Sequence, residues 1–296
     1  MKAIAGLAPD SPSLTELGGT VWSVETKDVP LAFNPAICKD SNGGLAVVAR
    51  RSNYQLDTYF GSLTIPSGAK SVKNATYFSY LDKNLSPSKW SRIEFKGGPD
   101  LFRGPEDARL IRRGSDFYLS VVLLERDIPR ARVALYQLDI DKMVATHIET
   151  YPGTEEKRPE KNWMTHLELG NIDFSFIKEL PNNIRGGSSL IPWGTGYLAL
   201  CHKTYLNKNR FYNPLIFGVQ EGVERTYTHV FVEFDSKLKI RNVSDEFFLV
   251  GRGIEFATGL VELGTDLLIS FGKNDREAWF GKIPAIKIKK MLNEGA

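Results

Sequence analysis

The 296-residue chain contains few cysteines and few histidines, and both shortages narrow its chemistry. Cys38 and Cys201 sit in apolar runs without the spacing of a disulfide framework, so we expect two buried, reduced thiols. The four histidines are too scattered for a zinc or iron site, and we expect no metal: His147, His166, His202 and His229. The sequence also lacks a phosphate-binding loop, a dinucleotide-binding glycine motif and a serine-nucleophile motif, so no organic cofactor is expected.

Charge of one sign and long hydrophobic runs are also lacking. The 38 basic and 35 acidic residues are mixed along the chain, and the only basic run, 287–290, is short. This pattern does not favour nucleic-acid binding. No run approaches the ~18 apolar residues of a membrane span, and Pro9 and Pro12 interrupt the N-terminal apolar stretch too early for a signal peptide. We expect a soluble, cytoplasmic protein with no membrane partner, and a homo-oligomer is compatible with these features.

Helical periodicity is scarce, whereas strand signals are frequent. Only the stretch from Ala285 to Glu294, directly after Pro284, predicts a helix. Short runs rich in β-branched and aromatic residues predict strands, and most follow a glycine-containing turn. These runs are 45–50, 117–124, 132–139, 197–202 and 267–272. Aromatic residues make up 11% of the chain, which suits both pleated strands and the stacking surfaces that sugars need.

The turn-and-strand pattern recurs along the chain. Counting 117–139 once as a hairpin, and adding a degenerate copy at 172–177, gives five copies, most of them roughly 55–75 residues apart. Radial repetition of this kind predicts an all-β, five-bladed β-propeller with four-stranded antiparallel blades. It would form a single domain over residues 1–296, with about residues 1–30 closing the last blade. A β-sandwich or two β-domains is the alternative, but no linker rich in proline and serine divides the chain.

The segment 103–110 gathers groups that can carry chemistry. Two carboxylates, Glu106 and Asp107, and two arginines, Arg103 and Arg109, lie beside a Gly-Pro turn just before a predicted strand. Inverting glycoside cleavage requires a carboxyl group that donates a proton to the glycosidic oxygen. A neighbouring arginine can hold a carboxylate ionised or capture an anion. From these residues alone, a solvated turn with a surface ion pair is the favoured interpretation.

Further motifs lie on both sides of this segment. They occur in a fixed order from about residue 33 to residue 280. Including the segment, the motifs are Asn34-Pro35-Ala36, Arg50, Gly104-Pro105-Glu106-Asp107-Ala108-Arg109, Lys161-Asn162-Trp163, His202, Tyr227 with His229, 254–260 and Ser270-Phe271-Gly272-Lys273-Asn274-Asp275. Together these motifs resemble glycoside hydrolase family 130, the five-bladed propeller enzymes that include β-mannoside phosphorylases and β-mannosidases. The resemblance implies an oligosaccharide or mannoside substrate, with inorganic phosphate as co-substrate.

The resemblance also implies roles for individual residues. Asp107 would be the general acid, passing its proton through a sugar hydroxyl while phosphate attacks from the opposite face. Glu255 is a second catalytic candidate, because Gly253 and Gly259 near it permit close backbone approach. The implied phosphate ligands are Arg50, Arg109, Lys161, Asn162 and His229. The implied substrate-binding residues are Asn34, Glu106, Trp163, His202, Tyr227 and Asp275.

Each role has a plainer alternative, and the motifs depart from the family pattern. Asn34 can simply cap a turn, His202 can be a core histidine, and Lys161 can be solvated. Ala108 stands where the family has proline, and two of its phosphate-binding cations have no evident counterpart, although Arg185 is a candidate substitute. Three functions therefore remain open: an inverting phosphorylase, a hydrolase that uses water and a second carboxylate, and a mannosyltransferase or sugar-binding propeller.

Overall fold

The computed structural model describes most of the chain, and its architecture is almost entirely β. The described residues are 4–56, 63–65, 71–99, 103–124, 131–151, 162–167, 174–177, 180–181, 183–213 and 218–294. The predicted C-terminal helix is confirmed as α1 (Ala285–Glu294). Within these ranges, no helix has the length and hydropathy needed to cross a bilayer.

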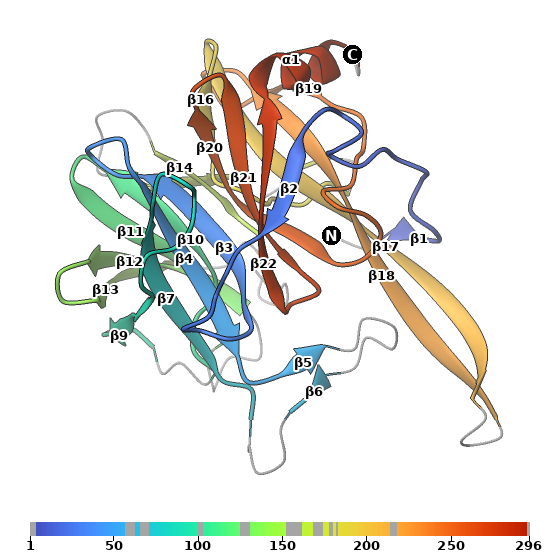
Figure 1. Cartoon of the computed structure of the whole chain (residues 1–296), viewed down its shortest axis with the longest axis horizontal. Coiled ribbons are helices and arrows are strands. Elements are labelled where there is room, and N and C mark those ends of the chain that lie inside the picture. Colours follow the sequence, from blue (N-terminus) through green and yellow to red (C-terminus); the bar gives the residue numbers. More distant parts are fainter. Residues whose placement is uncertain are drawn as a thin grey trace.

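Four sheets of at least four strands form the body of the molecule (Figure 1). The first sheet has the order β3 (Ala32–Lys39), β4 (Leu45–Ser52), β7 (Asn74–Leu81) and β8 (Ser91–Arg92). The second has the order β10 (Glu106–Arg113), β11 (Asp116–Leu124), β12 (Ala131–Asp139), β13 (Val144–Tyr151) and β9 (Glu94–Lys96). The third contains β16 (Ile191–Trp193), β17 (Gly196–Asn213), β18 (Gly218–Phe234), β19 (Ile240–Val243) and β1 (Ile4–Ala5). The fourth has the order β2 (Thr20–Ser23), β22 (Glu277–Pro284), β21 (Asp266–Lys273) and β20 (Glu255–Leu263).

The described residues form a β-propeller with four blades, so the predicted five blades are wrong. Among the described residues, the segment between the second and third sheets contributes only the two-stranded sheet of β14 (Met164–Leu167) and β15 (Phe174–Ile177). The degenerate copy at 172–177 had been counted as a whole blade. Only about twenty residues separate it from residue 197, too few for the remaining strands of a four-stranded blade. A further two-stranded sheet pairs β5 (Gln55–Leu56) with β6 (Leu63–Thr64).

Glycine turns explain the recurring pattern in the sequence. Gly114 joins β10 to β11 and Gly264 joins β20 to β21, and both have left-handed backbone angles, φ 58° and 63°. Glycine adopts these angles without a steric penalty, which allows a tight hairpin between the first two strands of a sheet. The predicted hairpin of 117–124 with 132–139 is confirmed by the pairing of β11 with β12.

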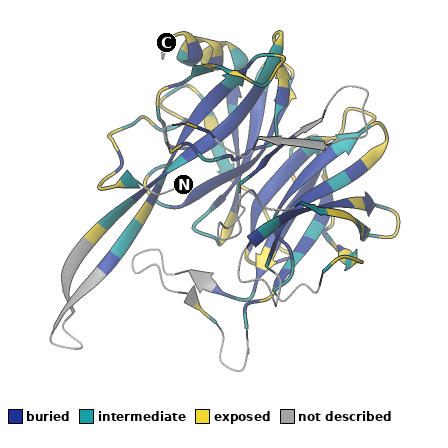
Figure 2. Cartoon of the chain, turned by 180° about the vertical axis from the view of Figure 1, so that it is seen from behind, coloured by how far each residue is buried: buried dark blue, intermediate teal, exposed yellow. Residues whose placement is uncertain are grey.

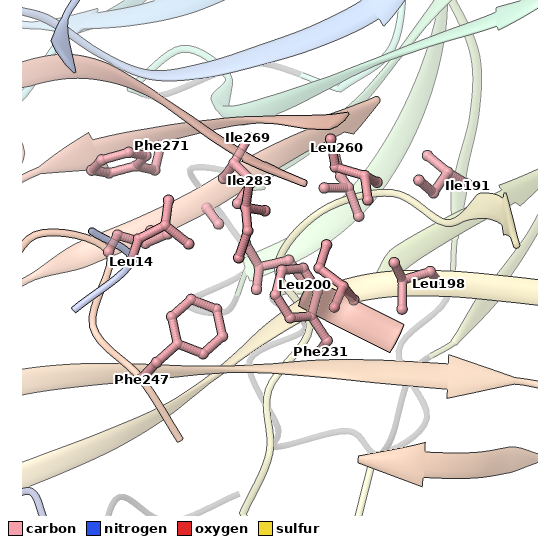
Figure 3. Packing of buried hydrophobic residues seen from close by; sticks show 14 of the residues in the cluster. Leu14, Ile191, Leu198, Leu200, Phe231, Phe247, Leu260, Ile269, Phe271 and Ile283 are labelled. Atoms are coloured by element: carbon pink, nitrogen blue, oxygen red, sulfur yellow. The ribbon is translucent and has the colours of Figure 1, made fainter. Parts of the chain in front are cut away.

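The N-terminal segment completes the fourth sheet. β2 pairs antiparallel with β22, so the beginning of the chain and its last strand lie side by side. Leu14, just before β2, is fully buried in the largest apolar cluster, among Phe247, Phe271 and Ile283 (Figure 3). Seen from behind, buried residues run along the sheets and exposed residues concentrate at turns and outer strands (Figure 2).

The third sheet contains a feature that the sequence did not predict. The predicted strand 197–202 is the first third of β17, which pairs with β18 over seventeen residue pairs, from Tyr197–Phe234 to Asn213–Gly218. The two strands project from the body as a long ribbon (Figure 1). Both cysteines are free thiols: Cys201 is buried on β17, whereas Cys38 is only partly buried.

Candidate active site

Three strands that pack against one another hold the central side chains of the site. β3 contacts both β10 and β20, so one strand from each of the first, second and fourth sheets meets its neighbours here. The pairing of β3 with β4 is interrupted between Phe33 and Ala36, and that of β10 with β11 between Glu106 and Arg109. Such irregularities redirect side chains that a regular strand would place elsewhere. Asn34 and Asp107 lie within them.

A cavity of about 480 Å³ opens at this place. Its lining includes Asn34, Arg50, Glu106, Asp107 and Asn162, together with His202, Tyr227 and Asp275. The structure therefore brings eight predicted site residues to one cavity, although they are spread over more than 240 positions of the chain. These eight residues share one cavity, and their roles remain predictions.

Arg50 organises the carboxylates of the cavity. Its guanidinium is buried on β4 and lies 3.0 Å from Asp107 Oδ1 and 3.2 Å from Glu106 Oε1. Burial alone would lower the pKa of Arg50, but its interactions with Asp107, Glu106, Tyr54 and Asp275 together outweigh burial and raise the pKa. Asn34 Nδ2 donates to the same Asp107 oxygen at 2.7 Å, so two donors hold that oxygen in place. The side chain of Asp107 keeps 15% of its surface exposed and can be reached from the cavity.

Tyr54 connects this group to the fourth sheet. Its hydroxyl donates to Asp275 Oδ2 at 2.9 Å and accepts from Arg50 at 3.4 Å. Asp275 is carried by the turn between β21 and β22, where Asn274 and Asp275 both have left-handed φ angles, 54° and 51°. Burial raises the pKa of Asp275, with Asp107 adding to the effect and Arg50 opposing it.

The third sheet and the segment that leads into it contribute cationic and aromatic side chains to the same cavity. Arg185, just before β16, exchanges two backbone hydrogen bonds with His202 on β17. The His202 ring stacks on Tyr227 with centroids 4.8 Å apart and meets Phe256 edge-on at 5.3 Å. Arg103, Arg185 and Arg225 all line the cavity. The wall therefore combines cations and aromatic faces, which suits a sugar together with an anion.

Several predicted site residues lie outside the cavity lining. Glu255 is fully buried, and its two carboxylate oxygens accept hydrogen bonds from three backbone amides, Leu249, Val250 and Gly251, at 2.8–3.0 Å. Burial raises the pKa of Glu255 to about 7. Because both oxygens hold this loop in place, the structure removes Glu255 as a candidate catalytic group.

Three predicted ligands are buried behind the cavity wall, and one lies outside the described residues. Trp163 is 1% exposed and packs near Tyr151, so it offers no stacking face to a sugar. His229 is fully buried and tilted against Phe247, and burial lowers its pKa to about 3. Arg109 is 2% exposed and donates from Nε to Gly187 O at 2.8 Å. Lys161 falls outside the described residues.

The structure also adds three residues that the motifs did not identify, Tyr54, Asn74 and Arg225, and it places Arg103, which had been noted only as a neighbour of Glu106 and Asp107, on the cavity wall. Asn74 accepts from Arg50 Nε at 3.1 Å and donates to Glu106 at 3.3 Å. It therefore holds both members of the Arg50–Glu106 ion pair in position. Its carbonyl also faces Gly104 so closely that a side chain at Gly104 would collide with it. The Gly-Pro turn before Glu106 was the only sequence signal of this close approach.

Comparison with known proteins places this geometry in a wider context. No protein-family model and no curated protein matches the sequence. Among solved structures, a β-1,2-mannobiose phosphorylase from Listeria innocua in complex with β-1,2-mannobiose is 14% identical over 93% of this chain and 99% of its own, with a TM-score of 0.62. The chain shares the fold of the mannoside phosphorylases.

Two further structures support this assignment of the fold. A mannose phosphorylase from Leishmania mexicana in complex with phosphate ion is 12% identical over 93% of this chain and 92% of its own, with a TM-score of 0.56. A structure from the GH130 family of mannoside phosphorylases, described as containing hydrolases that target β-1,2-mannosidic linkages in Candida mannan, is 14% identical over 87% of this chain and 85% of its own, with a TM-score of 0.59. The resemblance to glycoside hydrolase family 130 is confirmed at the level of the fold.

Proposed function

We propose that this protein is a carbohydrate-active enzyme that cleaves β-mannosides with inorganic phosphate and inverts the anomeric centre. The observation that carries the proposal is that a positioned carboxyl group and several arginines reach one cavity from different sheets. Asp107, positioned by Asn34 and Arg50, lies among the first, second and fourth sheets, whereas Arg185 and Arg225 belong to the third sheet and the segment that leads into it. A proton donor and a cationic wall in one cavity are what phosphorolysis requires.

In this mechanism the carboxyl group of Asp107 supplies the proton that the leaving oxygen takes, directly or through a sugar hydroxyl. A phosphate oxygen attacks the anomeric carbon from the other face as the glycosidic bond breaks, and the products are α-mannose 1-phosphate and the shortened saccharide. Arg185 and Arg225, with Asn162, would hold the phosphate near the reacting carbon. Guanidinium groups suit this task because they offer paired donors to oxyanions.

The described carboxylates do not favour a water-based mechanism. Inverting hydrolysis needs a second carboxylate about 6.5–9.5 Å from the acid to activate water. Glu255 is occupied by backbone amides, Glu106 is paired with Arg50, and Asp275 accepts from Tyr54. The arginines of the cavity therefore favour phosphate over water as the nucleophile.

Turnover of mannosides with and without phosphate tests the proposed reaction. We expect β-linked mannobioses incubated with phosphate to yield mannose 1-phosphate, and α-mannose 1-phosphate with mannose acceptors to release phosphate. Asp107→Asn should reduce both rates by about 10²–10⁴-fold, the usual contribution of a general acid. Asp116→Asn, an exposed position on β11, should leave them unchanged. Free mannose formed in phosphate-free buffer would instead identify a hydrolase, and no turnover in either direction would favour a transferase or a sugar-binding protein.

Kinetics with varied phosphate test the cationic wall separately. Arg185→Gln and Arg225→Gln should each raise the KM for phosphate by about 10- to 100-fold, because a hydrogen bond to a charged group is lost. Arg92→Gln, on the exposed end of β8, is the matched control and should keep the wild-type KM. An unchanged KM in both cavity variants would remove these arginines from the phosphate site.

A further inference from the structure

A second cavity lies further along the strands that carry the candidate active site. Its volume is about 350 Å³, and β3, β10 and β20 line it together with the segment 189–192. On each of these strands its lining begins three or four residues beyond that of the first cavity, which is about 10–13 Å along a strand. Because β3 contacts both β10 and β20, the same three strands frame both cavities.

Most of the side chains around this second cavity are apolar. Six of them are at most 9% exposed, so the wall is part of the packed interior: Ile37, Leu110, Ile111, Ile191, Leu260 and Val261. A side chain at Gly259 would collide with the backbone nitrogen of Ile37, so β20 and β3 pack closely and hold the wall in place. A preformed, mainly apolar cavity of about 300–1,000 Å³ is typical of small-molecule sites. We therefore name it the apolar cavity.

The charged side chains at the apolar cavity are mainly basic. Among the described residues, its lining contains two cations, Lys39 and Arg112, and one carboxylate, Glu262. Arg112 donates from Nε to Lys39 O at 2.8 Å and from Nη1 to Gly114 O. Within the described part of the chain, Arg112 forms no ion pair, and its Nη2 has no hydrogen-bond partner. The guanidinium thus keeps its charge and the donors of Nη2 available beside an apolar wall.

We propose that the apolar cavity binds a small amphipathic carboxylate, with its hydrocarbon part against the core side chains and its carboxylate on Arg112. Guanidinium groups suit carboxylates because their N–H donors match the carboxylate oxygens, and Lys39 adds positive charge to the same place. A neutral hydrocarbon would not use the charge of Arg112, and a saccharide would bury hydroxyl groups against apolar walls. This inference goes beyond the proposed reaction and does not depend on it.

Isothermal titration calorimetry with sodium octanoate, 1-octanol and octylammonium chloride tests the proposal, because the three probes share eight carbons and differ in the head group. We expect octanoate to bind about 10- to 100-fold more tightly than 1-octanol, the range for a hydrogen bond to a charged group, and octylammonium to bind most weakly. Arg112→Gln should abolish the difference between octanoate and 1-octanol. Arg113→Gln is the matched control and should keep the wild-type affinities, since Arg113 is the next residue of β10 and does not line the cavity.

Labelling of Cys38 with N-ethylmaleimide locates the bound octanoate in the wild-type protein and does not depend on any variant folding. Cys38 lines the apolar cavity and is partly buried, whereas Cys201 is fully buried. Burial raises the pKa of Cys38 to about 12, with Arg112 opposing the effect, so labelling is slow enough to follow by mass spectrometry. We expect octanoate to slow the labelling of Cys38 over the concentration range in which it binds.

Four results would overturn the proposal. The first two are the absence of octanoate binding and equal affinities of octanoate and 1-octanol for the wild type. The third is the wild-type octanoate affinity in Arg112→Gln, or unchanged labelling of Cys38 at saturating octanoate. The fourth is displacement of octanoate by α-mannose 1-phosphate, which would place the carboxylate in the candidate active site.

Discussion

At the scale of single residues, the site uses backbone angles that few side chains tolerate. Asn34, Asp107 and Asn162 have φ values of 49°, 48° and 62°, in the left-handed region. Asparagine and aspartate enter this region more readily than other non-glycine residues. The residue type at each position thus serves both the backbone and the chemistry. For this reason Asp107→Asn is the right substitution to test the proposed acid, since an alanine there would add backbone strain to the loss of the carboxyl group.

Gly272→Ala should impair the site without changing any group that touches substrate. A methyl group at Gly272 would overlap the side-chain oxygen and the backbone nitrogen of Asn34, so Asn34 would have to move. Its 2.7 Å hydrogen bond to Asp107 would then be lost. We expect kcat/KM for mannoside phosphorolysis to fall by roughly 10- to 100-fold, the range for a hydrogen bond to a charged group.

Gly251→Ala provides the control for this substitution. An added methyl group at Gly251 meets no atom within 4 Å, so the same chemical change should leave kcat/KM at the wild-type value. Circular dichroism of both variants would verify that the fold is intact. Wild-type kcat/KM in a folded Gly272→Ala protein would show that the position of Asn34 is not needed for turnover.

At the scale of elements, the sequence predicted what depends on local patterns. The apolar runs became β4, β11, β12, β17 and β21, because apolar runs rich in β-branched and aromatic residues and the glycine turns before them are local properties. The site prediction named Asp107 and Asp275, which the motifs marked directly and which line the cavity from a strand irregularity and a turn; their roles stay predictions. It failed for Glu255, because the backbone amides that occupy its oxygens lie four to six residues away, in a loop with no motif of its own.

The errors in the fold arose from long-range structure. The five-blade count treated 172–177 as the equal of the other repeats, whereas only pairing in space shows that β14 and β15 form a sheet of two. The length of β17 and β18 was missed because their distal pairs lie beyond the apolar run at 197–202. Tyr54 was missed because its role depends on Asp275, 221 positions away, and Asn74 was missed because its role depends on Arg50, 24 positions away.

The segment that leads into β2 should contribute strongly to stability. Leu14 is fully buried, and its backbone amide donates to Phe248 O at 2.7 Å. Leu14→Ala would leave a cavity in the cluster of Figure 3 and should lower the free energy of unfolding by about 2–5 kcal/mol in urea titrations. Leu7→Ala, at a position 65% exposed, should change it by less than about 0.5 kcal/mol. Equal effects of the two substitutions would mean that this segment is not anchored by Leu14.

At the scale of the whole molecule, the interior holds titratable groups whose effects on acid stability oppose one another. Burial lowers the pKa of His202 well below its usual value and that of His229 to about 3. Burial raises the pKa of Glu255 to about 7 and also raises that of Asp275. Between about pH 6.5 and 4.5, unfolding lets the two histidines take up protons and Glu255 release one. The two histidines thus favour a decline in stability on acidification, which Glu255 and Asp275 oppose.

Two substitutions should therefore change the pH dependence of unfolding in opposite directions. Each histidine that is neutral when folded and protonated when unfolded contributes up to about 1.4 kcal/mol of lost stability per pH unit below pH 6.5. Urea titrations from pH 7 to pH 5 should thus show a shallower decline for His229→Gln than for wild type. Glu255→Gln should show a steeper decline, because Glu255 gains protons on folding and supports stability as the pH falls through 7. His147→Gln, on β13, controls for the loss of a histidine; parallel declines in all four proteins would contradict the assignment of these groups.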